Sequence, residues 1–221
     1  MISKVKRLLK ATAKKAIRLS IVFTRDVLWN TIAQFQQPAA QPCIIDKREN
    51  KGSTPVNTYW EDHTVFTPTF KNVWQSKAYI KQRFKKYPMW KEIMGLYGDH
   101  YNEIILDYGC GPGHDLIGFA LRSRARKIIG IDISEKALRL AAHRMSLHNI
   151  DLDRIDLILI QDSMLTIPLE DQSVDYVYCE GVLHHTSNPE ALLCEFYRIM
   201  KDGLSLSPKT GQCNKVDFDL P

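Results

Sequence analysis

Between residues 103 and 200, short apolar runs alternate with segments whose apolar residues recur every three or four positions. The runs predict strands over residues 103–108, 127–132, 155–160 and 174–179. The helical spacing predicts helices over residues 115–124, 134–148 and 188–200. Strands that alternate with helices pair in parallel through right-handed crossovers. We therefore predict an α/β fold with a doubly wound, Rossmann-like parallel sheet.

The chain before this α/β domain (residues 103–203) begins with a basic segment. Residues 1–25 hold eight Lys or Arg and no acid, whereas the rest of the chain has 22 basic and 25 acidic residues. Apolar positions at helical spacing predict a basic amphipathic helix over residues 1–35, which could lie on anionic lipid, touch nucleic acid, dock on a partner or remain solvated. Residues 36–58 contain three prolines and no sustained period, which predicts a linker.

Residues 59–102 are dense in aromatic side chains and are expected to form a leading helical lid. Ser76 is a candidate N-cap for a helix that runs to about Lys86, and Pro88 can open a second helix that ends near Gly95 or Gly98. Two short helices should therefore precede the first strand of the sheet.

The cysteine content is five, an odd number, and no two cysteines form a C-x-x-C pair. Neither a disulfide framework nor a zinc site is indicated, and we expect no bound metal. The apolar stretches near the N-terminus are too short for a membrane span. We expect a cytoplasmic protein, with peripheral contact to the inner membrane face through the basic helix as the membrane hypothesis.

Three glycines, Gly109, Gly111 and Gly113, follow the first predicted strand. Glycine at a strand-to-helix turn permits positive φ and lets a ligand approach the backbone, although a plain tight turn would also use it. Asp132 ends the next strand, where a carboxylate can accept both hydroxyls of a ribose. Asp107 stands two residues before the first glycine, where it would repel a pyrophosphate and attract an ammonium or sulfonium group. The pattern therefore disfavours a nicotinamide-dependent oxidoreductase.

Two stretches resemble motifs of class I S-adenosylmethionine-dependent methyltransferases: ILDYGCGPGHD at residues 105–115, and GVLHHTSNPEALLCEFYRIMKDG at residues 181–203. The second is similar to the bacterial type, in which V-L-H-H is followed by P-x-x-x-L-x-E-x-x-R-x-L-K-P-G-G. The resemblance covers residues 79–203 and implies S-adenosyl-L-methionine as the cofactor. The acceptor is expected to be a small molecule, a glycan or a lipid precursor. Methylation of a nucleic-acid base is disfavoured because no N-P-P-Y or D-P-P-Y segment follows the fourth strand.

The resemblance assigns cofactor contacts by position. Asp107 and the three glycines are expected to bind the methionine part of the cofactor. Asp132 and Ile133 are expected to bind the ribose and one face of the adenine. The adenine falls to Asp162 and Met164, although Met164 could equally be core packing. Glu180 closes the fourth strand near the reactive methyl group.

Four further side chains have two possible roles each. His184 and His185 are candidates to remove the acceptor's proton, and we expect only one of two adjacent residues to face a ligand. Tyr79 and Arg83 share one face of a predicted helix with Tyr87. Tyr79 and Arg83 could bind the cofactor carboxylate or an anionic group of the acceptor, or could simply pack on the sheet.

After Met200 the chain departs from the family's pattern, because it reads KDGLSLSPKTGQCNKVDFDLP instead of K-P-G-G and further strands. We therefore expect an atypical tail over residues 204–221 and a strand order of 3-2-1-4 with the later strands missing. The fourth strand would then be an unpaired edge that favours self-association, unless the tail folds back over it. A truncated cofactor-binding or inactive remnant is the alternative function.

Overall fold

The computed structural model describes residues 40–49, 52, 54–64, 69–86, 88, 97–164, 166–201 and 212–213. Within these residues, six strands form one sheet in the order β1-β4-β3-β2-β5-β6. Their bounds are β1 Ile44–Asp46, β2 Ile104–Tyr108, β3 Lys127–Asp132, β4 Ile155–Leu159, β5 Tyr176–Tyr178 and β6 Gln212–Cys213. The basic helix predicted over residues 1–35 lies outside the described residues and stays a prediction.

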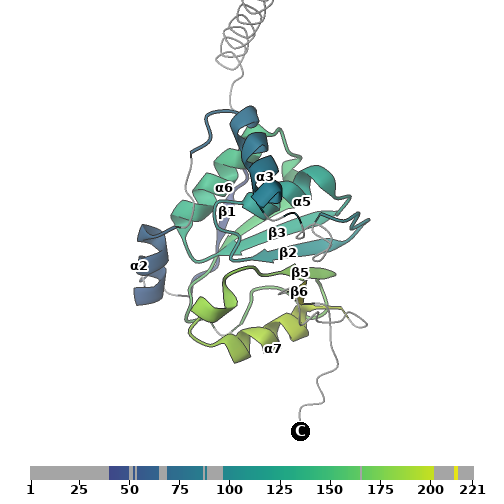
Figure 1. The fold of residues 1–221 in the computed structure, drawn as a ribbon. Coiled ribbons are helices and arrows are strands. Elements are labelled where there is room, and N and C mark those ends of the chain that lie inside the picture. The colour runs from purple at the N-terminus through teal and green to yellow at the C-terminus, as the bar shows by residue number, and fades with distance from the viewer. Residues whose placement is uncertain are drawn as a thin grey trace, which may run out of the picture. The chain divides into compact units, whose positions relative to one another are not determined.

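The four central strands confirm the predicted sheet. β4, β3, β2 and β5 pair in parallel in that order, which is the predicted order 3-2-1-4. Their apolar runs lie between two helical layers, so side chains on both faces of the sheet are buried. Figure 1 shows α3, α5 and α6 on one face of the sheet and α7 on the other.

The helices of the α/β domain are α5 His114–Arg122, α6 Glu135–Leu147 and α7 Pro189–Ile199. Two of them begin at the predicted caps. The Ser134 hydroxyl accepts a hydrogen bond from Ala137 N at 3.1 Å, and the Asn188 side chain accepts one from Ala191 N at 2.9 Å. Short 3-10 turns, η1 Leu152–Arg154 and η2 Leu183–His185, precede β4 and α7.

The leading helix α3 spans Val73–Lys86 and begins earlier than predicted. Asn72 caps it by accepting from Gln75 N at 3.0 Å. Ser76, the expected cap, is instead fully buried, and its hydroxyl accepts from Arg144 Nε at 2.7 Å. Ser76 therefore serves packing rather than helix initiation. The second helix predicted after Pro88, with Tyr87, falls outside the described residues.

The segment predicted as a linker contains regular structure. β1 pairs in parallel with the outer edge of β4, and α2 begins at Pro55 and ends at Asp62. Thr54 caps α2 by accepting from Asn57 N at 3.1 Å, and proline at the first helical position is pre-organised for a helix. The three-residue strand is too short to give a periodic signal, whereas the Thr-Pro pair is a readable helix start.

The edge of β5 is paired, so the expectation of a fully unpaired fourth strand is wrong. β6 runs antiparallel to β5 and brings Val177 opposite Cys213 and Tyr178 opposite Gln212. The remaining residues of 204–221 lie outside the described part of the chain. Self-association along this strand stays a prediction. No helix in the described part of the chain is long and apolar enough to cross a membrane.

Candidate functional site

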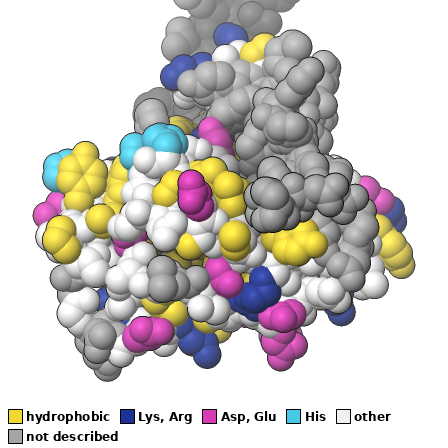
Figure 2. All heavy atoms as spheres, turned by 90° about the horizontal axis from the view of Figure 1, so that it is seen from below, with side chains coloured by type: hydrophobic (Ala, Val, Ile, Leu, Met, Phe, Trp, Pro, Cys, Tyr) yellow, Lys and Arg dark blue, Asp and Glu magenta, His cyan; other side chains and the backbone are white. Residues whose placement is uncertain are grey.

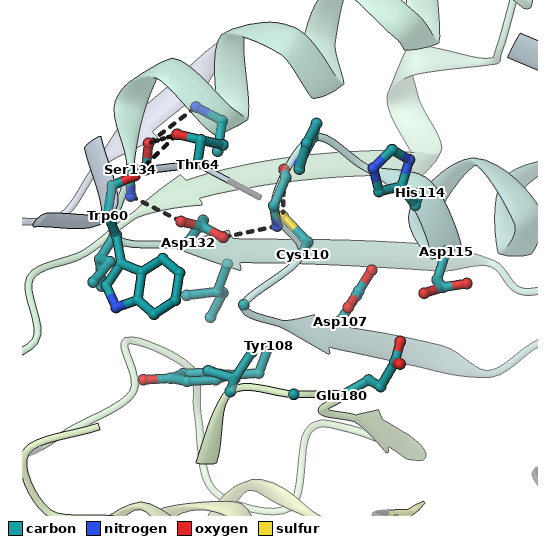
Figure 3. A pocket seen from close by; sticks show the side chains of 18 of the residues that line it. Trp60, Thr64, Asp107, Tyr108, Cys110, His114, Asp115, Asp132, Ser134 and Glu180 are labelled. Carbon is teal, nitrogen blue, oxygen red and sulfur yellow. Dashed lines mark hydrogen bonds between the residues drawn. The ribbon is translucent and has the colours of Figure 1, made fainter. Parts of the chain in front are cut away.

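A cavity of about 610 Å³ lies at the carboxyl ends of the parallel strands (Figure 3). Loops that follow β2, β3, β4 and β5 form its floor and sides, and residues of α2 and α3 complete the lining. A ligand in an open α/β sheet is expected at this place. Of the thirteen predicted site residues, the lining includes eleven: Tyr79, Arg83, Asp107, Gly109, Gly111, Asp132, Ile133, Asp162, Glu180, His184 and His185.

The three glycines of the turn have different roles. Each has a positive φ, between 52° and 73°. A Cβ on Gly109 would lie 2.3 Å from a methyl group of Val182, and one on Gly113 would lie 3.0 Å from Cβ of Ala141. A Cβ on Gly111 would meet no atom within 4 Å, so this glycine borders open space in the cavity. Gly113 does not line the cavity and packs closely against Ala141 of α6, so its contact with the cofactor stays a prediction.

Asp107 points into the cavity from the end of β2 (Figure 3). Its side chain is buried, with 3% of its surface exposed, and its Oδ2 atom has no hydrogen-bond partner. Burial raises the pKa of Asp107 well above its ordinary value, and nearby Asp115 adds to the rise. A buried acceptor without a donor costs free energy. The site is therefore pre-organised for a ligand that brings a donor or a positive charge.

Asp132 ends β3 and lies across the glycine turn from Asp107 (Figure 3). One carboxylate oxygen accepts from Gly111 N at 2.7 Å, and the other accepts from Ser134 N at 2.8 Å. Burial raises the pKa of Asp132, although these backbone donors oppose the rise. Because each oxygen can accept more than one bond, the carboxylate keeps capacity for a ligand hydroxyl.

Arg83 joins two carboxylates on the α3 side of the cavity. One terminal nitrogen lies 2.6 Å from Asp115 Oδ2 and 2.5 Å from Glu180 Oε2. The hydroxyl of Tyr178 donates to both carboxylates, and that of Tyr97 donates to Asp115 at 2.6 Å. Burial lowers the pKa of Arg83, but the two carboxylates outweigh this effect and hold it above its ordinary value. Arg83 thus neutralises protein acids and does not present a bare charge to an anionic acceptor.

Tyr79 lines the cavity, and its ring stacks on the ring of His114 with 4.7 Å between the two centroids. Buried Arg144 donates to Nδ1 of His114 at 2.6 Å, and its guanidinium lies over the ring of Phe70. Burial lowers the pKa of Arg144 to about 10. This network holds the N-terminus of α5 behind the glycine turn.

The residues that were expected to contact the adenine lie in two different places. Ile133 and Asp162 line the cavity, whereas Met164 packs against the apolar core on the α7 side of the sheet. Met164 thus packs against the core as the structural alternative expected, and its contact with the adenine stays a prediction. Asp162 accepts hydrogen bonds from the backbone nitrogen and the hydroxyl of Ser187, which fixes the direction of its carboxylate.

Both His184 and His185 line the cavity, which differs from the expectation that only one would face it. They lie on the short 3-10 turn η2 at the rim, where no helical face has to be buried against the sheet. Their ring centroids are 3.9 Å apart, and that of His185 lies 5.0 Å from the ring of Trp60. Figure 2, viewed from below relative to Figure 1, shows histidine side chains gathered at the surface beside apolar ones.

Sequence reasoning missed several lining residues. Trp60 and Thr64 reach the cavity from α2 and the residues after it, and Asp115 and Tyr178 face it from α5 and β5. An acid two residues after the last glycine of the turn was a usable signal for Asp115. No local pattern marks Trp60, because its place depends on how α2 docks on the sheet.

Residues 99–212, just over half of the chain, match the methyltransferase domain family. The chain is 32% identical over 120 residues to an uncharacterized 37.1 kDa protein in transposon TN4556 of Streptomyces fradiae, covering 54% of this chain and 33% of that protein. It is 26% identical over 113 residues to the malonyl-[acyl-carrier protein] O-methyltransferase of Serratia marcescens, covering 51% and 40%. The chain thus spans about a third to two fifths of the length of these curated relatives.

Among solved structures, the geranyl diphosphate C-methyltransferase from Streptomyces coelicolor A3(2), in complex with Mg²⁺, geranyl diphosphate and S-adenosyl-L-homocysteine, superposes with a TM-score of 0.49 at 18% identity. The superposition covers 67% of this chain and 61% of that chain. The parallel sheet, the glycine turn and the matched domain agree on one assignment. The chain belongs to the methyltransferase domain family, within the class I S-adenosylmethionine-dependent methyltransferases.

Proposed function

We propose that the cavity binds S-adenosylmethionine and that the protein transfers its methyl group to a small-molecule, glycan or lipid-precursor acceptor. The observation that carries this proposal is the buried Oδ2 of Asp107, which has no partner and lies in the same cavity as the open backbone of Gly111. A ligand with a positively charged donor and a slim chain would satisfy both features. The α-amino end of S-adenosylmethionine has this chemistry.

The remaining residues fit the rest of the cofactor. Asp132 would accept the ribose hydroxyls, with Ile133 against the adenine and Asp162 near its amine. Gly109 keeps the turn close to Val182 and so sets the position of the loop that would hold the methionine part. When bound, the cofactor supplies a methyl group activated on a positively charged sulfur.

The protein's own part in methyl transfer is positioning, water exclusion and proton removal. The strand-end loops hold the two reactants in one cavity, which lowers the entropic cost of an in-line displacement. Either His184 or His185 at the rim would accept a proton from the acceptor, because a neutral imidazole has one ring nitrogen that can accept a proton. The stack between Trp60 and His185 would keep that ring against the cavity.

The charges of the lining favour a neutral acceptor. Five carboxylates line the cavity, at positions 107, 115, 132, 162 and 180, against two cations, Arg83 and Lys86. Arg83 is bonded to two of these carboxylates. An anionic group would be repelled, so a hydroxyl is a better acceptor than a phosphate or carboxylate. Release of S-adenosylhomocysteine during incubation with matched neutral and phosphorylated alcohols would test this choice.

Asp132→Ala is expected to weaken binding of S-adenosylhomocysteine about tenfold or more. A carboxylate that accepts two hydroxyls contributes roughly 1.5–3 kcal/mol through hydrogen bonds to a charged group. Calorimetric titration of the variant and the parent protein measures the difference. Asp153→Asn, on the exposed turn η1, is the matched control and should bind as the parent does. Equal affinity of Asp132→Ala and the parent would remove the ribose assignment.

Removal of residues 1–35 is expected to leave binding of S-adenosylhomocysteine unchanged, because the cavity is lined by residues 60–186. If the basic segment contacts anionic lipid, the full chain should float with anionic vesicles at low salt and the trimmed chain should not. Equal flotation of the two proteins would refute the membrane hypothesis.

A further inference from the structure

Asn57 is a buried side chain on α2, outside the matched residues 99–212. Only 6% of its surface is exposed, although asparagine usually lies at the surface. It occupies the third position of the helix, one turn before Trp60, which lines the cavity. A buried amide on an element outside the α/β domain requires a structural reason.

The amide of Asn57 uses all four of its hydrogen-bonding positions. Its Nδ2 donates to Ile133 O at 3.1 Å and to Ile160 O at 3.4 Å. Its Oδ1 accepts from Asp162 N at 3.1 Å and from the hydroxyl of Thr54 at 2.6 Å. Two acceptors on one side and two donors on the other fix the orientation of the amide.

These partners belong to the two loops that would surround the nucleoside. Ile133 follows β3 directly after Asp132, while Ile160 and Asp162 follow β4. Within the sheet, β3 and β4 are held by backbone pairing that ends at Asp132 and Leu159. Beyond that point, the Asn57 side chain bonds to both loops and replaces the missing backbone pairing.

A second set of contacts fixes α2 against the sheet. Glu61 accepts from the Ser134 hydroxyl at 2.7 Å and from Lys136 N at 3.0 Å, at the N-terminus of α6. A carboxylate at a helix N-terminus is stabilised by the helix dipole. The same Ser134 donates its backbone N–H to Asp132. Helix α2 is therefore tied to the ribose side of the cavity at two separate points.

We propose that Asn57 is a positioning residue of the cofactor site, whose amide sets the spacing of the loops after β3 and β4 around one nucleoside. This inference rests on the proposed function, because it takes the ligand to be S-adenosylmethionine. Asn57 does not line the cavity, so it acts through Ile133 and Asp162. Its loss leaves two carbonyl oxygens and one N–H group without this partner and lets the loops move apart.

The test compares two ligands, S-adenosylhomocysteine and 5′-methylthioadenosine, which carries the nucleoside without the amino acid. Asn57→Ala is expected to weaken both ligands by the same factor, about tenfold or more. Asp107→Asn is expected to weaken the binding of S-adenosylhomocysteine and to leave the binding of 5′-methylthioadenosine unchanged. When every variant is folded, a role confined to general stability would leave both affinities equal to those of the parent protein. Calorimetry at a temperature at which every variant is folded gives both affinities for the parent and for each variant.

Asn149→Ala is the matched control, because it also replaces an asparagine and costs stability at a distant site. Asn149 is exposed after α6 with φ of 51°, a conformation that alanine adopts unfavourably. This variant should bind both ligands as the parent does. If Asn57→Ala does not fold, Asn57→Ser gives the same comparison with one hydrogen-bonding group retained.

The outcomes separate the two proposals. Failure of the parent protein to bind S-adenosylhomocysteine would contradict the proposed function itself. If the parent binds and the Asn57 variant binds both ligands within twofold of it, the positioning role is wrong. If the Asn57 variant loses affinity for S-adenosylhomocysteine and not for 5′-methylthioadenosine, the positioning role is also wrong, because Asn57 would then act at the amino-acid end of the ligand.

Discussion

Arg83→Met is expected to lower the free energy of unfolding by roughly 3–5 kcal/mol, the usual cost of removing one partner from a buried ion pair. Methionine retains much of the side-chain volume but leaves Asp115 and Glu180 as neighbouring carboxylates without their shared cation. The hydroxyl of Tyr178 donates to both acids and cannot neutralise them. Urea denaturation of the variant and the parent at pH 8 measures the loss.

The loss caused by Arg83→Met should shrink as the pH falls. Burial already raises the pKa of Glu180 in the parent, and removal of Arg83 takes away an opposing effect. A carboxyl whose folded pKa is raised carries its full stability penalty above the folded pKa, and this penalty shrinks to zero as the pH falls from the folded pKa to the unfolded pKa. Denaturation at pH 5 should therefore show a smaller difference than at pH 8. Arg126→Met, at an exposed site, should change stability by less than about 0.5 kcal/mol. Similar small losses of stability in both variants would show that Arg83, Asp115 and Glu180 do not form a buried ionic network.

Asp107→Asn is expected to weaken S-adenosylhomocysteine by about a hundredfold while it raises the stability of the ligand-free protein. The loss follows because an amide cannot pair with the ammonium group as a carboxylate does, and a charged bond in a dry site contributes roughly 1.5–3 kcal/mol. Stability is expected to rise because the pKa of Asp107 is raised in the folded protein, so that ionisation of this carboxyl opposes folding at neutral pH. Calorimetry and urea denaturation on the same samples measure the two effects.

The pH dependence of binding supplies a check on Asp107. Affinity of the parent for S-adenosylhomocysteine should fall as the pH drops through the raised pKa, because protonation removes the charge that attracts the ammonium. The Asp107→Asn variant should lack this part of the pH dependence. A variant that loses stability and keeps full affinity would mean that the Asp107 carboxylate serves the fold and not the ligand.

The part of the fold that sequence predicted is the part with strong local signals. The four central strands are apolar runs buried on both faces, and Ser134 and Asn188 mark helix starts through side chains that cap their own helix. Asp107 and Asp132 were predicted from their positions, because one stands two residues before the glycine turn and the other ends the next strand, where a ligand of a parallel sheet binds.

Other features depend on contacts between distant residues and have no local pattern. Asn57 falls in the segment predicted as a linker, and three of the four hydrogen-bond partners of its amide lie 76 or more positions away in the sequence. Gly113 belongs to the same motif as Gly111, but the approach of Ala141 decides that it packs against a helix. The packing of partly buried Met164 against the core and the pairing of β6 with β5 likewise follow from the assembled sheet.

Titration of the parent protein with S-adenosylhomocysteine and, separately, with NAD tests the central claim most directly. The unpartnered Asp107 carboxylate beside the open Gly111 backbone predicts saturable one-to-one binding of S-adenosylhomocysteine and no binding of NAD. Binding of NAD, or no heat with either ligand at concentrations well above a millimolar, would contradict the assignment of this cavity to S-adenosylmethionine.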